Sequence, residues 1–278
     1  MSSLSEEEVV ELEKRARSIR QQIIKMLGEA GGGHYGGSLS VVEILVALYF
    51  HILKVDPENP LWPDRDRLIL SKGHACAALC PILAERGFFS RQLLSTFNKL
   101  DSPFGMHPDM HKIPGCDMST GSLGHGLPVG VGMALAGKMD RKDFRVFVIL
   151  GDGENDEGSV WEAAMSAAHY KLDNLIAIVD RNRLSLDGPT AEIMSLEPLQ
   201  EKWETFGWHV QNIDGHNVKD IVRSVESIQK GKPNVILAQT VKGKGVSFME
   251  GKYLWHARVA TPEEEAQAIK QLETQTTD

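Results

Sequence analysis

The chain has 278 residues, with 30 Lys and Arg against 38 Asp and Glu, a formal net charge of −8, and 42 % hydrophobic residues. This composition is typical of a globular protein that is long enough to bury a core without disulfide or zinc staples. The acidic balance, without a clustered basic face, argues against a general affinity for nucleic acid or anionic membranes. Neither a spanning apolar run nor a signal-peptide pattern is evident, so we expect a cytoplasmic protein.

The three cysteines, Cys76, Cys80 and Cys116, form no metal-binding pattern. Their number is odd, the first two lie one helical turn apart in an apolar run, and no CxxC pair occurs. Buried thiols in a reducing compartment are the expected state.

The N-terminal half alternates between helical patterns and glycine-rich loops. Apolar residues recur at helical spacing behind a capping box that starts at Ser5, and this pattern ends at the glycines of 31–33. A buried strand is predicted over 67–70, and an irregular stretch with several prolines over 101–121. Further helices are predicted over 40–53, from the end of that strand to 83, and from the 121–126 segment to 138.

The C-terminal half indicates a parallel sheet. Strands predicted over 144–150 and 175–179 are apolar throughout and are joined by a helix over 161–170. Strands that are apolar on both faces are typical of parallel sheets covered by helices. Further strands are predicted over 209–213 and 234–239, and further helices over 196–207, 218–229 and 261–272. We therefore predict an α/β fold, a parallel sheet flanked by helices on both faces, as a single domain over 1–278.

The strongest chemical signal follows two of these strands. Gly151-Asp152-Gly153 ends one strand, and Asn182 follows the next strand, thirty positions after Asp152. Ligands of such sheets bind beyond the carboxyl ends of the strands. A carboxylate, an amide oxygen and a backbone carbonyl could hold Mg²⁺ against a diphosphate, and glycines let the backbone approach phosphates closely. Taken alone, such a triplet is more often a plain strand-ending turn.

The surrounding sequence is more specific. The stretch from Gly151 to Gly158, followed by Asn174 to Asn182, resembles the thiamine diphosphate motif, and in detail it resembles transketolase. Such matches cover roughly residues 8 to 260 in the same order as in that family. They extend to Gly33-His34, Leu70–Ala75, Gly105–Pro108, Pro114–Gly126, Thr240–Gly245 and Trp255-His256.

The resemblance implies which residues bind the cofactor. Asp152 and Asn182 would bind Mg²⁺, or Ca²⁺ or Mn²⁺ in its place, through their side chains, and Leu184 through its backbone carbonyl. Lys244 would lie near the diphosphate. The full set of implied cofactor-binding residues is His74, Gly121, Ser122, Leu123, Gly151, Asp152, Gly153, Glu154, Asn182 and Lys244.

The resemblance also implies catalytic and interface residues. His34 and His256 would handle protons of the substrate hydroxyls, and His107 would hold the C1 hydroxyl of the donor. Imidazole suits this work because its unperturbed pKa lies near neutrality. Glu157 and Glu162 would lie at a subunit interface, although each could simply be a helix N-terminal carboxylate.

Single-chain transketolases are more than twice this length, because a further domain binds the aminopyrimidine ring. The sequence therefore resembles the N-terminal, diphosphate-binding subunit of a split transketolase. We expect a partner subunit that carries the pyrimidine domain, an α2β2 assembly, and ketose and aldose sugar phosphates as substrates. The donor stays open, since Tyr35 replaces a proline that is common in full-length enzymes.

Three alternatives stay open. The chain could act on a modified ketose, such as a sulfonated or branched sugar. It could be the diphosphate-binding subunit of another thiamine enzyme, such as a 2-oxoacid dehydrogenase or a deoxyxylulose phosphate synthase, although those share the Gly-Asp-Gly and Asn but not the four histidines. It could also be a cofactor-binding regulator without activity.

Overall fold

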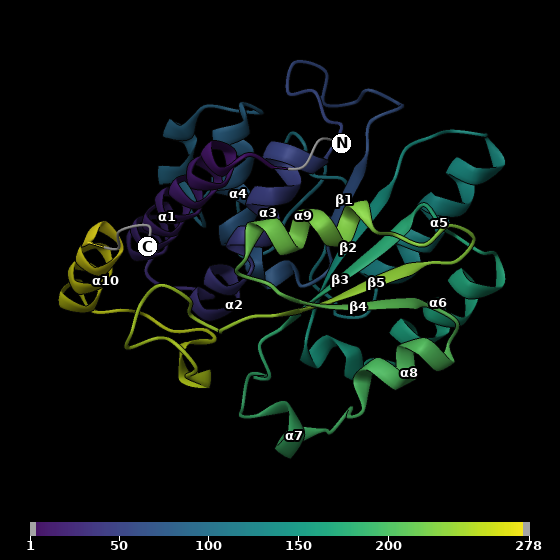
Figure 1. Cartoon of the computed structure of the whole chain (residues 1–278). Helices are drawn as coiled ribbons and strands as arrows, with labels where there is room; N and C mark the ends of the chain where they lie inside the picture. Colours follow the sequence, from purple (N-terminus) through teal and green to yellow (C-terminus); the bar gives the residue numbers. More distant parts are fainter. Residues whose placement is uncertain (1–3, 275–278) are drawn as a thin grey trace.

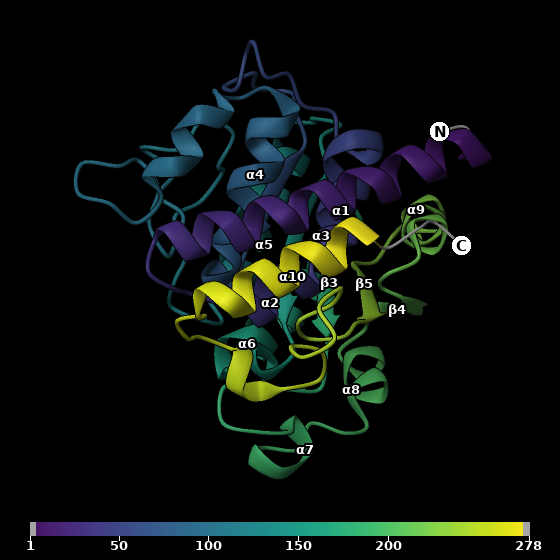
Figure 2. The ribbon, with the colours of Figure 1, turned by 90° about the vertical axis from the view of Figure 1, so that its left-hand side faces the viewer.

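The computed structural model describes residues 4–274 as a parallel sheet enclosed by helices (Figures 1 and 2). The strands lie in the order β1-β2-β3-β5-β4, and every neighbouring pair is parallel. The predicted fold class is confirmed. The strands are β1 (Arg67–Leu70), β2 (Val146–Gly151), β3 (Leu175–Arg181), β4 (His209–Asp214) and β5 (Asn234–Gln239).

Helices cover both faces of this sheet (Figure 1). One layer contains α1 (Glu6–Glu29), α2 (Tyr35–Ser40), α3 (Val42–Ala47), α4 (Cys76–Arg86) and α9 (Val218–Glu226), with α10 (Pro262–Thr274) packed on α1. The other layer contains α5 (Gly126–Met139), α6 (Gly158–His169) and α8 (Leu199–Thr205). Between residues 4 and 274, none of the helices combines the length and the apolar character needed to cross a membrane.

The strands explain why two layers of helices are needed. Side chains alternate between the faces of a strand, and β2 is buried along its whole length. Phe147 and Ile149 join the apolar cluster under α1 to α4, whereas Val146, Val148 and Leu150 join the cluster under α5, α6 and α8. Each face therefore buries its own core, which brings the carboxyl ends of the strands to one common edge.

The long helix α1 follows the sequence prediction closely. Its capping box is present, since the Ser5 side chain accepts from the Glu8 amide at 3.2 Å and Glu8 accepts from the Ser5 amide at 2.8 Å. Its apolar stripe, including Ile19 and Ile23, is fully buried. Such amphipathic spacing fixes a helix through packing more than through propensity.

The segment after α1 differs from its prediction. A loop was expected up to residue 40, but α2 already begins at Tyr35, directly after His34, and the expected helix over 40–53 is divided at Val41. Burial overrides the poor helix propensity of Gly36 and Gly37, because a side chain at Gly36 would meet Lys242 and the Trp255 carbonyl. The division at Val41 follows Ser40, whose hydroxyl bonds the Gly37 carbonyl at 3.2 Å.

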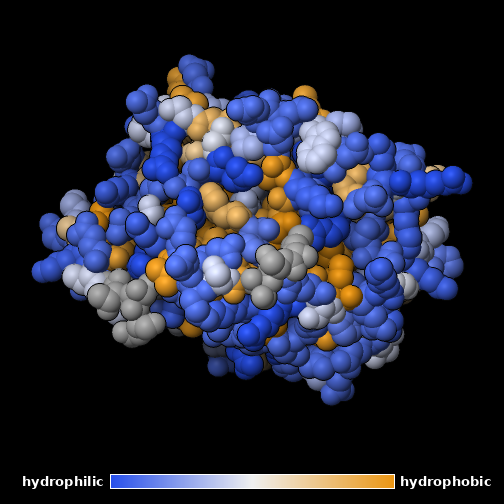
Figure 3. Space-filling model, turned by 45° about the horizontal axis from the view of Figure 1, so that its top comes forward, coloured by the Kyte–Doolittle hydropathy of each residue, from blue (hydrophilic) through white to orange (hydrophobic). Residues whose placement is uncertain are grey.

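Other differences are at element ends. The strand expected from residue 144 begins at Val146, and the helix expected over 196–207 is shortened to α8. Two short helical turns, Arg91–Thr96 and α7 (Thr190–Ile193), were not predicted, because neither has an apolar period that the sequence would reveal. The face in Figure 3 is mostly hydrophilic, with hydrophobic side chains visible between the polar ones.

Candidate active site

Polar loops meet at the carboxyl edge of the sheet and enclose a cavity of about 290 Å³. Asp152 follows β2 and Asn182 follows β3, and the register of these strands places Gly151 opposite Asp180. Asp152, Asn182 and Leu184 all line the cavity. The parallel sheet thus brings together the residues that the sequence suggested as metal ligands.

The chemistry of these groups fits a hard divalent cation. The Asp152 carboxylate and the Asn182 amide supply oxygen atoms, as Mg²⁺ prefers. The carbonyl oxygens of Leu184 and Ser185 accept hydrogen bonds from the Lys242 ammonium at 3.2 and 2.7 Å, so they already face a cation. Within residues 4–274, no group of three or more His, Cys, Asp or Glu side chains is arranged so that it could hold a metal ion by itself. A metal site here would therefore use oxygen atoms from both side chains and the backbone as ligands.

The electrostatic environment of Asp152 also favours a bound cation. Burial raises the pKa of this carboxyl to about 6, although it accepts a hydrogen bond from the Arg183 amide. A buried carboxylate without a matching positive charge is unfavourable. A bound cation would supply that charge.

Four histidines converge beside the cavity. The ring centroid of His34 lies 5.4 Å from His74, 6.0 Å from His107 and 5.6 Å from His256. His74 and His256 are stacked at 5.1 Å and line the cavity. These side chains come from four separate segments of the chain, so the fold alone brings them together.

The environment favours the neutral form of His34, His74 and His256. Burial and the positive charge of Lys242 lower the pKa of His256 to about 3. Burial, then the Lys72 charge, holds the pKa of His74 well below its usual value, and burial with the His107 charge lowers that of His34. A neutral imidazole can accept a proton or a hydrogen bond at one nitrogen and donate at the other. The cluster is therefore suited to exchanging protons with hydroxyl groups.

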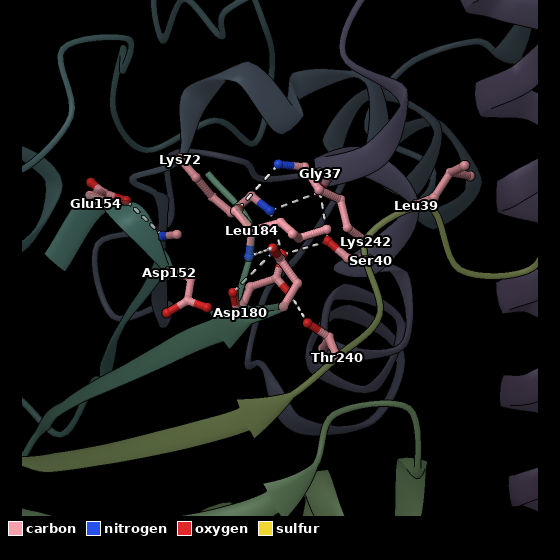
Figure 4. A network of polar contacts seen from close by, with 12 residues as sticks. Gly37, Leu39, Ser40, Lys72, Asp152, Glu154, Asp180, Leu184, Thr240 and Lys242 are labelled. Carbon is pink, nitrogen blue, oxygen red and sulfur yellow. Dashed lines mark hydrogen bonds and ion pairs between the residues drawn. The ribbon is translucent and has the colours of Figure 1, made fainter. Parts of the chain in front are cut away.

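A buried ion pair supports the floor of the cavity (Figure 4). The Lys72 ammonium donates to the Asp180 carboxylate and, at 2.8 Å, to the Gly37 carbonyl. Asp180 also accepts from the hydroxyls of Ser40, at 2.6 Å, and Thr240. Since both charged side chains are almost fully buried, these hydrogen bonds fix α2 against β3 and β5. Sequence reasoning did not pair Lys72 with Asp180, because Lys72 follows β1 and Asp180 lies in β3, more than a hundred residues further along the chain.

The lysine in the cavity differs from the one proposed from the sequence. Lys242 lines the cavity and its ammonium lies 3.0 Å from His256 Nδ1, whereas the Lys244 ammonium lies 4.0 Å from the Glu250 carboxylate. Gly243, with φ of +80°, turns the chain between the two lysines. Burial and the Lys72 charge lower the pKa of Lys242 to about 8. The two lysines are indistinguishable in the Lys-Gly-Lys-Gly pattern, so only the fold separates them.

The glycine loop after β2 is organised by Glu154. Its carboxylate accepts hydrogen bonds from the amides of Gly151, at 2.8 Å, and Gly124, at 2.9 Å, and from the Ser71 hydroxyl. Gly151 and Gly153 line the cavity beside it. Because both of its carboxylate oxygens accept hydrogen bonds from the protein, Glu154 stabilises the conformation of this loop at the wall of the cavity.

The remaining candidates lie around the cavity mouth. Leu123 lines the cavity, Ser122 is exposed, and a side chain at Gly121 would stand 3.4 Å from the His107 ring. Glu157 is exposed immediately before α6, and Glu162 is exposed in the first half of that helix. Their exposure leaves them accessible to another chain.

Known proteins resemble this chain along most of its length. The family model described as "Transketolase, thiamine diphosphate binding domain" matches residues 12–275. The 6-deoxy-6-sulfo-D-fructose transketolase subunit of Clostridium sp. (strain MSTE9) is 50 % identical over 96 % of this chain and 98 % of its own. One of the apulose-4-phosphate transketolase subunits, from Phocaeicola vulgatus, is 45 % identical over 95 % of both chains.

Structural similarity extends to single-chain enzymes. The crystal structure of transketolase from Campylobacter jejuni superposes with a TM-score of 0.89 at 32 % identity, over 94 % of this chain and 42 % of that one. The fold, the arrangement of the cavity and the family match agree. The chain belongs to the transketolase family and corresponds to its thiamine diphosphate binding domain.

Proposed function

We propose that this chain is the N-terminal subunit of a split transketolase that depends on thiamine diphosphate and Mg²⁺. The reaction transfers a two-carbon ketol unit from a ketose donor to an aldose acceptor. When bound, the cofactor supplies the carbanion chemistry, and the protein supplies position, charge and proton transfer. The observation that carries this proposal is the convergence of four histidines beside a cavity that is lined by Asp152, Asn182 and Leu184.

Each part of the site has a distinct task in this proposal. Asp152, Asn182 and the Leu184 carbonyl would hold the metal ion, and Lys242 would lie beside the negative charge of the diphosphate. His34 and His256 would exchange protons with substrate hydroxyls, because their lowered pKa values leave them neutral.

The proposal includes a partner subunit. Two relatives that match this chain over nearly their whole length are named as transketolase subunits, and single-chain relatives are more than twice as long. We infer that a second chain supplies the pyrimidine-binding domain, in an α2β2 assembly. Glu157 and Glu162, which are exposed, would lie at a subunit interface of this assembly and link its two active sites.

A modified ketose is the second candidate for the donor. It is favoured by the names of two relatives, which refer to a sulfonated fructose and to apulose 4-phosphate. An ordinary donor, such as xylulose 5-phosphate, is the first candidate. It is favoured by the resemblance to transketolase from Pichia stipitis, 28 % identical, which has been solved in complex with that sugar.

A reconstitution assay tests the proposal. The chain alone and the chain with candidate partners are assayed for ketol transfer with thiamine diphosphate and Mg²⁺. The donors are xylulose 5-phosphate, 6-deoxy-6-sulfofructose and apulose 4-phosphate. We expect activity only in a mixture, and the preferred donor then separates the two candidates. Decarboxylation of a 2-oxoacid in place of ketol transfer would overturn the proposal.

A further inference from the structure

A chain of polar contacts runs from the N-terminal helix to the loop that carries Lys242. Arg20 on α1 donates to the Glu43 carboxylate on α3, at 2.6 Å between Nη2 and Oε2. The same carboxylate oxygen lies 2.9 Å from Nδ1 of His216, and Nε2 of His216 lies 2.8 Å from the amide nitrogen of Val241. None of Arg20, Glu43, His216 and Val241 lines the cavity, so the proposed chemistry does not use them directly.

The two neighbours of His216 determine its tautomer. Burial alone would raise the pKa of Glu43, but the Arg20 charge and the hydrogen bonds from His216 and Arg20 lower it to about 2. Glu43 is therefore a carboxylate that can only accept, so Nδ1 of His216 must carry the proton. The Val241 amide can only donate, so Nε2 must present its lone pair. Both contacts demand the same neutral form.

The His216 side chain supplies a backbone hydrogen-bond acceptor at the point where β5 leaves the sheet. Gly215 donates to the Gln239 carbonyl at 2.8 Å on the β4 side, and Thr240 donates to the Arg181 carbonyl at 3.2 Å on the β3 side. The next amide, that of Val241, faces the β4 side again, but β4 has already ended at Asp214. The imidazole supplies the acceptor that a further strand residue would have provided.

This contact fixes the residue immediately before Lys242. Beyond it, the Gly243 amide donates to the Gly36 carbonyl at 3.0 Å, so the backbone is anchored on both sides of Lys242. The Lys242 side chain then reaches the carbonyls of Leu184 and Ser185. A shift at Val241 would move the ammonium away from these oxygens.

We propose that His216 is a positioning residue: its neutral Nδ1–H imidazole, oriented by the buried Arg20–Glu43 pair, holds the Val241 amide and thereby places Lys242 in the cavity. The inference rests on the proposed function for the part that Lys242 plays toward the diphosphate. The placement of the loop itself is independent of that function.

The test uses the full chain and two substitutions. His216→Phe keeps a ring but removes both hydrogen bonds, whereas His216→Gln keeps one donor and one acceptor on a planar group. We expect amide exchange in peptides covering 240–252 to quicken about tenfold in His216→Phe without cofactor, because one hydrogen bond is lost. Peptides from α5 and α6 should keep the wild-type rate. The affinity for thiamine diphosphate with Mg²⁺ should fall about tenfold, with substantial recovery in His216→Gln. His209→Phe, at the opposite end of β4, is the matched control and should change neither.

Several results would overturn the inference. They are unchanged exchange over 240–252 in His216→Phe, an equal acceleration throughout the chain, or a His216→Gln variant that behaves like His216→Phe. A measurement on the unsubstituted chain needs no variant to fold: long-range nitrogen–proton NMR correlations should show His216 as the Nδ1–H tautomer, and the Nε2–H tautomer would contradict the proposal. If the wild-type chain takes up no thiamine diphosphate even together with its partner subunit, the proposed function fails, while the exchange rates and the His216 tautomer still test the position of the loop.

Discussion

The ring of Tyr35 packs edge-on against Trp255, with centroids 5.8 Å apart and planes at 88°. Each of these buried residues is the direct neighbour of a candidate active-site histidine, and the rings of His34 and His256 lie 5.6 Å apart. Backbone hydrogen bonds between Gly33 and Arg258 join the same two segments. The aromatic pair therefore sets the separation of two histidines from different ends of the chain.

Truncating Tyr35 should destabilise the fold and disturb the site. Tyr35→Ala removes a fully buried aromatic ring and should lower the free energy of unfolding by about 3–5 kcal/mol. Tyr35→Phe keeps the ring and should stay within about 1 kcal/mol of the wild type. Denaturant titration of both variants checks this. A Tyr35→Phe variant as unstable as Tyr35→Ala would show that packing against Trp255 is not the main contribution.

Separating Lys72 from Asp180 should be more damaging than replacing both. Lys72→Met leaves a buried carboxylate without its positive partner and should lower the free energy of unfolding by about 3–5 kcal/mol. Asp180→Asn leaves the ammonium without a charge partner. Because each single change creates an unpaired group, the double variant should be less destabilised than the sum of the two. Additive effects in this double-mutant cycle would contradict direct coupling.

The cofactor-free chain should lose stability as the pH falls below about 6.5, in part through His256. The folded-state pKa of His256 is lowered to about 3, so the unfolded chain binds a proton first as the pH falls through the ordinary histidine value. Its contribution is complete above about pH 6.5 and is lost progressively toward pH 3. His34 and His74 act in the same direction, whereas Asp152, with a raised pKa, acts in the opposite one below about pH 6.

A variant isolates the His256 contribution. His256→Gln should make the dependence of the unfolding free energy on pH less steep between pH 4 and 6.5. The decrease in slope should be at most about 1 kcal/mol per pH unit, because solvent screens the partly exposed ring. Denaturant titrations at several pH values measure this slope. An identical slope in the variant and the wild type would show that His256 is not held neutral by its surroundings.

The sequence predicted the sheet, and the shared edge at which the metal-ligand candidates lie, for a simple physical reason. Continuous apolar strands such as β2 and β3 must be covered on both faces, and the residues that follow parallel strands, Asp152 and Asn182, must share an edge. The transketolase motifs added the histidines, which no periodicity would have placed together.

Other features depend on tertiary packing that local patterns do not contain. The choice of Lys242 over Lys244 is made by a left-handed turn at Gly243 and by burial against His256. The early start of α2 follows from the close approach of Gly36 to Lys242 and Trp255. The ion pair of Lys72 and Asp180 spans more than a hundred residues, so its partners cannot be matched from the sequence.

Replacing Asp152 should separate cofactor binding from folding. Asp152→Asn removes a buried charge whose pKa is raised to about 6, so the cofactor-free chain should be unchanged or more stable by about 1–2 kcal/mol at neutral pH. Uptake of thiamine diphosphate with Mg²⁺ should be lost, because the carboxylate would be the only charged ligand of the metal. Calorimetry measures this uptake, with Asp156→Asn, an exposed carboxyl on the same loop, as the control. Unchanged affinity in Asp152→Asn would remove Asp152 from the metal site.

His107 offers the clearest separation of catalysis from structure. Its side chain is exposed and lies at the outer side of the histidine cluster, 6.0 Å from His34. His107→Ala should therefore leave stability, assembly and cofactor affinity unchanged while lowering kcat/KM for ketol transfer by about 100-fold, the effect of losing a positioned polar group at the reacting hydroxyl. His111→Ala, an exposed histidine in the same loop, is the matched control and should retain full activity. Wild-type donor kinetics in His107→Ala would remove His107 from the substrate site, whereas a defect in both variants would assign the effect to the loop.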